Sequence, residues 1–307
     1  MSPRRRAAVG GPEGVLVVDK PAGMTSHDVV DRVRRLAGTG RVGHTGTLDP
    51  AATGVLVCCL GRATRLAAPL QAGTKLYAAV VHLGVTTDSD DLDGAVLTRT
   101  PATHLEEATV CGALGAFRGE QLQVPPMVSA VRIGGRRLHE IAREGGEVER
   151  PARRVRIDDL VLDRFTPGET AEVSLLVGCS AGTFVRSLAR DLGAALGTGG
   201  ALASLRRLAN GPFLVDDAVP LADLEADPGL LARRLLPVED AVRAALPVVE
   251  VDADVARRMA TGATPDRAGL PAPGVVTAYL HAGSLVAVHG PGRDAPVRVV
   301  WATSGAA

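Results

Sequence analysis

Apolar residues along the chain follow two kinds of spacing, one typical of strands and one typical of helices. Segment 54–61 encloses an uninterrupted apolar run, as expected for a strand that is buried on both faces. Segment 75–83 alternates, which would place Lys75 and Tyr77 on the same face of a strand. Further strands are expected at 14–19 and 171–179.

Helical spacing occurs in three segments. In the first, 26–37, we expect Ser26 to cap the helix and Gly38 to stop it. The second is 103–117. The third, 183–196, carries a predicted buried stripe of Leu188, Leu192 and Leu196.

The order of these elements predicts an α+β fold with a mixed β-sheet in a domain over residues 14–245. Segment 123–152 is rich in Gly, Pro and Arg, which indicates a mobile basic insertion in that domain. From Leu246 to residue 307, short Val-rich strands separated by Gly and Pro predict a small β module. Residues 1–13 contain three consecutive arginines and are expected to form a disordered basic tail.

Composition is that of a water-soluble globular protein, with 46% hydrophobic and 22% charged residues. The longest apolar run, 55–60, is too short to span a bilayer, and no signal-peptide core follows the N-terminal arginines, so we expect a cytoplasmic protein. The four cysteines form no CxxC pair, which argues against a zinc site and against a disulfide framework.

Charge is balanced overall but unevenly distributed. Segment 132–156 has eight arginines against four glutamates, and 32–87 has seven basic side chains against one acid. Segment 216–258 reverses the balance, with ten acids against five arginines. These segments fit either a basic face for a polyanion or ordinary solvated surfaces, and charge alone leaves both open.

The single acid of segment 32–87 is Asp49, in the glycine-rich sequence Gly43-His44-Thr45-Gly46-Thr47-Leu48-Asp49-Pro50. Neighbouring cations should lower the pKa of this carboxyl, and the glycines allow a ligand to approach the backbone closely. Asp49 is therefore a candidate nucleophile. The alternative is that Asp49 only starts a turn before Pro50.

Two other motifs fail on closer inspection. Segment 38–43 matches GxGxxG, but it follows a predicted helix and no acid lies about twenty residues beyond it. The aspartates of 88–93 resemble a calcium loop, yet aligning Gly94 with the loop glycine puts Ser89 and Thr100 in ligand positions. We therefore expect a solvated acidic turn, no metal and no cofactor.

Arg186 falls in the first turn of the helix expected over 183–196, in the strand-to-helix segment Cys179-Ser180-Ala181-Gly182-Thr183-Phe184-Val185-Arg186. A cation in this position is disfavoured by the helix dipole unless an anion lies nearby. Asp49 is a natural candidate for that anion, and an exposed surface arginine is the ordinary alternative.

Together these segments resemble the bacterial tRNA pseudouridine-55 synthase (TruB) family. The resemblance covers about residues 14–215 and rests on seven motifs in family order. They are Lys20–Ser26, Gly43–Pro50 with Gly54–Leu56, Gly61–Arg65, Lys75–Tyr77, Pro125–Ala130, Cys179–Gly193 and Leu205–Arg207. It implies a pseudouridine-synthase-like catalytic domain followed by a C-terminal β-barrel of the PUA type.

The resemblance also implies roles for single residues. Asp49 would be the catalytic aspartate, Arg186 its paired arginine, and Tyr77 the residue that stacks on the target base. The implied substrate-binding residues are Lys20, His44, Phe184 and Leu205. Three departures concern RNA contacts: Phe184 and His139 stand where the family usually has Tyr, and Leu202 stands where it usually has His.

The chemistry fits the residues. Forming pseudouridine breaks the C1′–N1 bond of a uridine and rejoins the uracil through C5, which imports no group and oxidises nothing. One carboxylate can suffice, because uracil leaves with its charge delocalised. Attack at C6, attack at C1′ and a glycal route all remain open. The implied partner is the T-arm of tRNA, bound by a monomer; the alternatives are an RNA chaperone without turnover and a guide-dependent, dyskerin-like synthase.

Overall fold

A computed structural model describes residues 11–129, 131–146, 148–292 and 296–301. The first ten residues of the predicted basic tail lie outside the described residues, as does the side chain of His139. The chain forms two compact units. Unit 1 comprises Met1–Pro50, Gly54–Gly73 and Asn210–Ala307, and unit 2 comprises Ala51–Thr53 and Thr74–Ala209.

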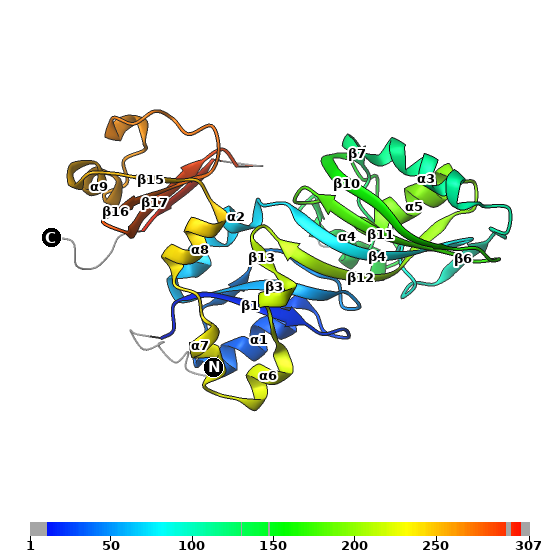
Figure 1. Cartoon of the computed structure of the whole chain (residues 1–307), viewed down its shortest axis with the longest axis horizontal. Coiled ribbons are helices and arrows are strands. Elements are labelled where there is room, and N and C mark those ends of the chain that lie inside the picture. Colours follow the sequence, from blue (N-terminus) through cyan, green and yellow to red (C-terminus); the bar gives the residue numbers. More distant parts are fainter. Residues whose placement is uncertain (1–10, 130, 147, 293–295, 302–307) are drawn as a thin grey trace. The chain divides into compact units, whose positions relative to one another are not determined.

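Unit 1 is built around β1 (Gly14–Lys20) and β3 (Thr53–Leu60), which pair antiparallel along the whole of β1. On the other edge of β1 (labelled with β3 in Figure 1) lies the parallel strand β14 (Val219–Pro220). Strand β2 (Val42–His44) pairs antiparallel with β3. The expected strands 14–19 and 54–61 are thus confirmed.

Alternate residues of β1 and β3 enter two different cores. Leu16 and Leu56 pack with α1 (Ser26–Ala37), α6 (Leu221–Ala226) and α7 (Leu230–Arg234). Val15 and Val57 pack on the opposite face with residues of η1 (Gly61–Leu66), α2 (Ala67–Gln71) and α8 (Val238–Ala245). This double burial explains why the sequence of β3 is apolar without alternation.

The C-terminal part of unit 1 is the predicted small β module. Its sheet has the order β15-β16-β17-β18, and closure into a barrel is not seen among the described residues. The strands are β15 (Val248–Glu250), β16 (Thr277–His281), β17 (Ser284–Gly290) and β18 (Val297–Val300). One face packs on α9 (Ala253–Ala260), which contributes Val255 and Met259, and Ala278 and Leu280 join the core that contains Val15.

The first helix, α1, has the predicted bounds but not the predicted cap. Thr25, not Ser26, is the N-cap: its side chain accepts from the Asp28 backbone, while the Asp28 carboxylate accepts from the Thr25 backbone. This reciprocal arrangement is a capping box. Ser26 is buried and its hydroxyl is used elsewhere, as described below. Gly38 ends the helix in the left-handed conformation, as expected.

Unit 2 contains a sheet of order β12-β4-β11-β10-β7. Its strands are β4 (Lys75–Leu83), β7 (Gly119–Gln123), β10 (Arg153–Thr166), β11 (Ala171–Cys179) and β12 (Gly200–Asn210). Helices α3 (Glu107–Leu114) and α5 (Val185–Ala195) lie on the same side of this sheet (Figure 1). Burial alternates strictly along β4, so Lys75 and Tyr77 share the buried face as predicted.

The expected helix over 103–117 is wrong in its first turn. The chain makes a turn that buries Ala102 and Leu105, and Glu106 is extended, so α3 begins only at Glu107. The helix then tightens into the 3-10 turn η2 (Gly115–Phe117). The Ala102 amide donates to the Glu169 carbonyl, and the Ala102 carbonyl accepts from the Leu105 amide. These bonds form a turn where the sequence pattern predicted the start of the helix.

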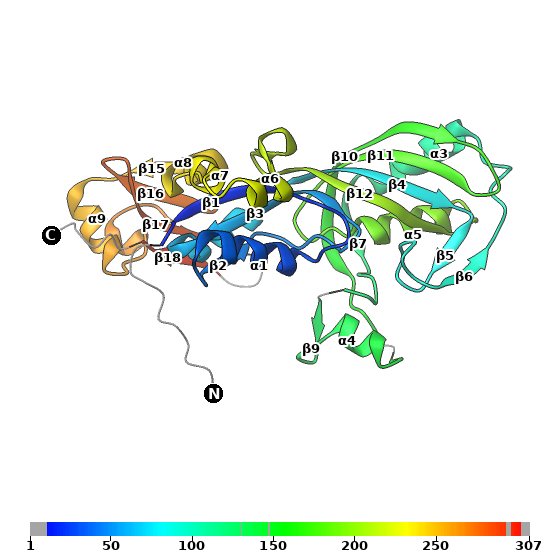
Figure 2. The same ribbon diagram turned by 90° about the horizontal axis from the view of Figure 1, so that it is seen from below.

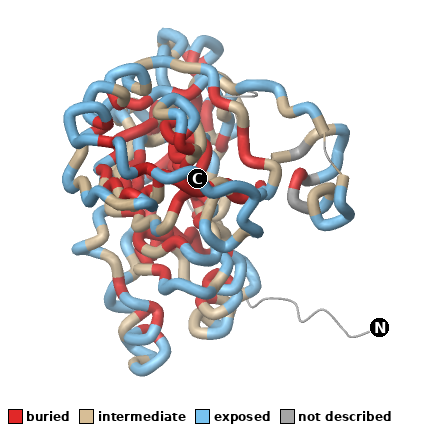
Figure 3. The backbone as a smooth tube through the Cα atoms, turned by 90° about the vertical axis from the view of Figure 1, so that its right-hand side faces the viewer, coloured by how far each residue is buried: buried red, intermediate tan, exposed pale blue. Residues whose placement is uncertain are grey.

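The basic insertion contains β8 (Arg132–Ile133), β9 (Arg136–Arg137) and the short helix α4 (Leu138–Arg143). Figure 2 shows β9 and α4 projecting away from the sheet of unit 2. The strands β5 (Val85–Thr87) and β6 (Val96–Arg99) form a separate hairpin, whose turn holds the acidic segment. Buried residues, red in Figure 3, lie inside, and exposed residues lie along the peripheral loops.

Candidate active site

Asp49 lies in the loop between β2 and β3, and it is half-buried. The residues on both sides of it are fixed. Ser26 Oγ accepts from the Leu48 amide at 2.8 Å and donates to the Leu48 carbonyl at 3.1 Å. On the other side, the Pro50 carbonyl accepts from Lys20 Nζ at 3.1 Å and from the Gly23 amide at 2.9 Å.

The first motif, residues 20–26, is therefore a brace for the Asp49 loop. Lys20 is fully buried and Ser26 is 2% exposed, so both side chains serve the interior of the unit. Charge-assisted bonds such as those from Lys20 are among the stronger hydrogen bonds in proteins. A carboxylate held on both sides in this way has little conformational freedom left to lose when it binds or reacts.

His44 lies at the start of the same loop and is half-buried. Its Nδ1 accepts from the Gly46 amide at 3.2 Å, which for a neutral ring assigns the proton to Nε2. The next residue, Thr45, is buried, and its Oγ1 accepts from Asn210 Nδ2 at 2.9 Å. Unit 1 thus gathers Lys20, His44 and Asp49 around one ordered loop.

In unit 2, Tyr77 and Lys75 lie on β4 opposite Val177 and Cys179 of β11. Tyr77 is 7% exposed and Lys75 is 6% exposed. Burial, with a smaller contribution from the nearby Arg207, lowers the pKa of Lys75 to about 8, while Cys179 acts in the opposite sense. Lys75 therefore still carries its charge for most of the time at pH 7.

Arg186 lies in the first turn of α5 and is 5% exposed. Its Nη1 donates to the Ser89 carbonyl at 3.0 Å and lies 3.3 Å from Asp91 Oδ2. An anion therefore does offset the unfavourable helix-dipole position, and within unit 2 that anion is Asp91. The alternative of an exposed surface arginine is wrong.

The expectation of a solvated acidic turn at 88–93 holds for Asp88 and Asp93, which are exposed, and is wrong for Asp90 and Asp91. Asp90 is only 9% exposed, and the Asp91 side chain is 19% exposed. Asp91 Oδ1 accepts from Ser89 Oγ at 2.5 Å and from the Asp93 amide at 3.2 Å, and the Asp91 carbonyl accepts from Thr87 Oγ1 at 2.6 Å. These bonds hold the Asp91 carboxylate in a position where it faces Arg186 of α5.

Asp90 pairs with Arg190, one helical turn beyond Arg186, at a distance of 2.8 Å. Burial raises the pKa of Asp90, although Arg190, Arg186 and Arg150 all act to lower it. The cost of removing this carboxylate from water therefore exceeds the attraction of its neighbours.

Phe184 and Leu205, the remaining predicted residues, are half-buried in unit 2. Phe184 is the N-cap residue of α5, and its backbone exchanges two hydrogen bonds with the Gln123 side chain, at 2.8 and 3.0 Å. Leu205 lies on β12. Sequence reasoning missed Gln123, Asp90, Asp91 and Arg190; the one available signal was the anion that Arg186 requires.

Comparison with known proteins assigns the chain to a family. The TruB family pseudouridylate synthase N-terminal domain matches residues 34–185, and the tRNA pseudouridylate synthase B C-terminal domain matches 186–243. The tRNA pseudouridine synthase B of Thermobifida fusca is 49% identical over 81% of this chain and 85% of its own. That of Nocardia farcinica is 46% identical over 94% and 92%. The chain belongs to the TruB family of pseudouridylate synthases.

The fold agrees with this membership. A solved Cbf5-Nop10-Gar1 complex contains a chain that is 27% identical and superposes with a TM-score of 0.70, covering 95% of this TruB-family chain and 84% of its own. The Nop10-Cbf5 complex of an archaeal box H/ACA sRNP gives 26% identity and a TM-score of 0.67, over 95% and 85%. TruB-family enzymes are isomerases, so the reaction class follows from the family.

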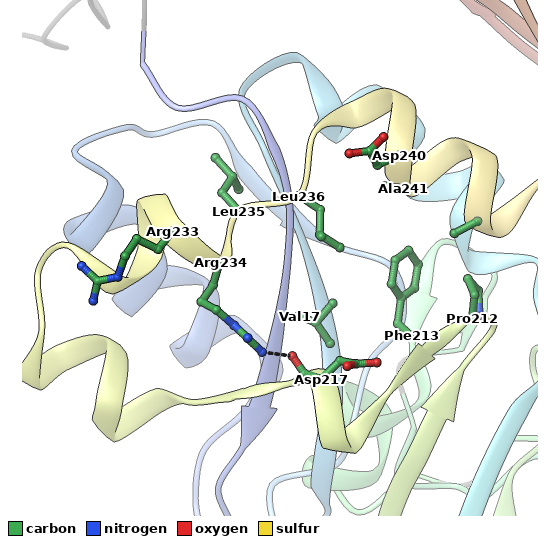
Figure 4. A pocket seen from close by; sticks show the side chains of 11 residues that line it. Val17, Pro212, Phe213, Asp217, Arg233, Arg234, Leu235, Leu236, Asp240 and Ala241 are labelled. Atoms are coloured by element: carbon green, nitrogen blue, oxygen red, sulfur yellow. Dashed lines mark hydrogen bonds between the residues drawn. The ribbon is translucent and has the colours of Figure 1, made fainter. Parts of the chain in front are cut away.

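A cavity of about 340 Å³ in unit 1 of this TruB-family chain lacks every predicted site residue (Figure 4). Its walls are mainly apolar, and Arg234 donates to the Asp217 carbonyl at 2.6 Å. The cavity is lined by Val17, Pro212, Phe213, Asp217, Arg233, Arg234, Leu235, Leu236, Asp240, Ala241 and Ala244. Nothing in it resembles a nucleophile braced for reaction.

Within the described part of the chain, no three His, Cys, Asp or Glu side chains cluster as metal ligands would. No helix of the described residues combines the length and hydropathy needed to cross a bilayer.

Proposed function

We propose that this enzyme converts uridine 55 in the T loop of tRNA to pseudouridine, with Asp49 as nucleophile and without a cofactor. The observation that carries the proposal is the loop of Asp49, braced on both sides by the motif 20–26, in a chain 49% identical to a tRNA pseudouridine synthase B. Asp49 is half-buried, which leaves part of the side chain accessible.

The reaction breaks the C1′–N1 bond of the target uridine, turns the uracil and forms a C1′–C5 bond. The C5 hydrogen leaves as a proton, and N1 gains one, so atoms and charge balance. An ionised Asp49 suits attack at C6, attack at C1′ or removal of a ribose proton. All three routes use one carboxylate, whereas glycoside hydrolysis requires two.

The other residues have supporting roles in the proposal. Arg186 stabilises the negative charge that Asp49 carries or that develops on the uracil. Tyr77 stacks on the base, and aromatic stacking contributes roughly 1–3 kcal/mol per base. His44, Phe184 and Leu205 contact the RNA around the target. Lys20, because it is fully buried and bonded to Pro50, acts by positioning the Asp49 loop.

Binding of the T-arm is assigned to the arginines of the insertion and to the C-terminal module, residues 246–307. Phosphate contacts by arginine would make the affinity depend on salt. The splayed bases of a folded loop allow recognition by shape. We propose that the enzyme acts as a monomer in the cytoplasm, with catalysis assigned to residues 14–245 and RNA binding assisted by the module over 246–307.

The test is tritium release from C5-labelled uridine in an unmodified tRNA transcript. The unchanged chain should release one tritium per tRNA, and a transcript with cytidine at position 55 should release none. Asp49→Asn should abolish release while the Kd for tRNA changes by only a few-fold. Full release by Asp49→Asn would show that another group is the nucleophile. A normal rate of release by Arg186→Ala would show that Arg186 takes no part in the mechanism.

The same assay decides between the proposal and its two alternatives. An RNA chaperone would bind the transcript and release no tritium. A guide-dependent synthase would release tritium only when a guide RNA and protein partners are added. The proposal is favoured over the guide-dependent alternative because the identity to tRNA pseudouridine synthase B is 49%, against 27% to the chain of the Cbf5-Nop10-Gar1 complex.

A further inference from the structure

The side chain of Arg190 joins three parts of unit 2. Its Nη1 lies 2.8 Å from Asp90 Oδ2 in the acidic turn, its Nη2 donates to the Val124 carbonyl at 3.1 Å, and its Nε donates to Asp191 at 2.9 Å. Val124 is the second residue of the basic insertion 123–152. One guanidinium therefore connects the acidic turn, the root of the insertion and helix α5.

The root of the insertion is attached to α5 by more than this one contact. Ser187 Oγ donates to the same Val124 carbonyl at 2.8 Å, and the Gln123 side chain exchanges two bonds with the Phe184 backbone. At the far end of the insertion, Arg150 Nη1 donates to the Pro125 carbonyl at 3.0 Å. The insertion thus begins on the first turn of the helix that carries Arg186.

Arg186 and Arg190 are four residues apart and so lie on one face of α5. They hold three consecutive residues of the acidic turn: Arg186 binds the Ser89 carbonyl and Asp91, and Arg190 binds Asp90. A displacement of the turn at Asp90 would therefore change the environment of the Arg186 guanidinium directly.

Side-chain packing does not fill the space between the turn and the insertion. A cavity of about 880 Å³ is lined by Thr87, Asp88 and Asp90 from the turn and by Val124, Met127 and Arg150 from the insertion. Arg190 also lines it. Its polar contacts reach both walls of the cavity, since Nη1 bonds to Asp90 in the turn and Nη2 to the Val124 carbonyl at the root of the insertion.

The backbone at Asp90 has a φ of +63°, in the left-handed region that residues other than Gly, Asn and Asp rarely adopt. Such a conformation persists only where the surroundings enforce it, and it is concentrated at functional sites. Here the surroundings are Arg190 at the carboxylate and the Leu202 amide, which donates to the Asp90 carbonyl at 3.0 Å.

We propose that Asp90 and Arg190 are positioning residues that fix Arg186 relative to the root of the RNA-binding insertion. The inference rests on the proposed function, because it assigns Arg186 to catalysis and the insertion to RNA. It goes beyond that function by naming a link between binding and chemistry. Loss of this link should slow the chemical step and leave the affinity for tRNA nearly unchanged.

The test compares three variants of the full chain by single-turnover tritium release at saturating tRNA transcript. Asp90→Asn removes the charge and keeps a residue that tolerates a positive φ. Arg190→Lys keeps the charge and loses the fork that reaches both Asp90 and Val124. Asp191→Asn is the matched control, since it removes the other carboxylate bound to Arg190, one that is 38% exposed and outside the acidic turn.

Asp90→Asn and Arg190→Lys should each lower the single-turnover rate about tenfold, with a Kd for tRNA within about threefold of the unchanged chain. The double variant should be no slower than the slower single variant, because both changes break one link. Asp191→Asn should stay within about twofold of the unchanged rate. Thermal unfolding identifies any variant that is unfolded at the assay temperature, and the other single variant then decides.

A normal rate in a folded Asp90→Asn or Arg190→Lys chain would overturn the inference. Additive losses in the double variant, or an equal loss in Asp191→Asn, would overturn it as well, since each would show a general structural effect. Absence of release by the unchanged chain would instead overturn the proposed function, and with it the inference.

Discussion

Replacing Asp91 by Asn should disturb Arg186 without changing the shape of the acidic turn. Asp91 Oδ2 lies 3.3 Å from Arg186 Nη1, and Oδ1 accepts from Ser89 Oγ and the Asp93 amide. Asn has one side-chain oxygen. If that oxygen keeps the bonds to Ser89 and Asp93, the amide NH₂ group faces Arg186, donor against donor.

The magnitude follows from burial. Removing one partner of a fully buried ion pair destabilises a protein by about 3–5 kcal/mol. The Asp91 side chain is 19% exposed, so water screens part of the interaction, and Arg186 keeps its bond to the Ser89 carbonyl. We therefore expect the free energy of unfolding to fall by about 2 kcal/mol. An equal loss of transition-state stabilisation would slow turnover roughly 30-fold.

Urea unfolding measures the first quantity, and single-turnover tritium release at saturating tRNA measures the second. Asp93→Asn is the control, because it makes the same charge change in the same turn on an exposed side chain. Its free energy of unfolding should change by less than about 0.5 kcal/mol. If Asp91→Asn matched Asp93→Asn in both stability and rate, the Asp91 carboxylate would not be the group that holds Arg186 in place.

Three further outcomes are expected. Gly94→Ala should lower both the melting temperature and the turnover rate, because a Cβ at this position would overlap Ser89 Oγ; an unchanged melting curve would contradict this contact. Lys75 loses its proton near pH 8 in the folded chain and near pH 10.4 in the unfolded chain. The unfolded state therefore binds more protons between these pH values, so the free energy of unfolding should rise with pH by about 3 kcal/mol. Urea unfolding at pH 7 to 10.5 should show this rise in the unchanged chain and not in Lys75→Met. Only Cys111 should react rapidly with a thiol reagent in the native protein, because the other three thiols are buried, and a second fast thiol would contradict that burial.

The main elements of the fold could be predicted because their patterns are local. The unbroken apolar run of β3 and the alternation of β4 each state how many faces of the strand are buried. The ends of α1 could also be predicted, yet two hydroxyl residues stand side by side at its start and only the structure shows which one is the cap. Thr25 caps, and Ser26 braces Leu48.

The site was less predictable, because its contacts join distant parts of the sequence. The contacts that brace the Asp49 loop span at most 30 residues of sequence, and Lys20, Ser26 and Asp49 all belong to motifs that carry the family resemblance. Arg186 and Ser89 are 97 residues apart, and Arg190 and Asp90 are 100 apart. Spacing within 88–93 carries no information about which helix packs over the turn, so a buried pair of carboxylates looks like a solvated one.

Two costly features coincide at Asp90. A left-handed backbone at a residue other than glycine costs on the order of 1–3 kcal/mol, and a buried ion pair adds little stability to offset it. The geometry gives the reason for both. Arg186 and Arg190 are one turn apart on α5, and the turn must offer each of them a carboxylate from adjacent residues. In an extended strand, Asp90 and Asp91 would point to opposite sides, so only one of them could face the helix. The positive φ at Asp90 bends the chain so that both do, which explains why the strain is retained in this turn.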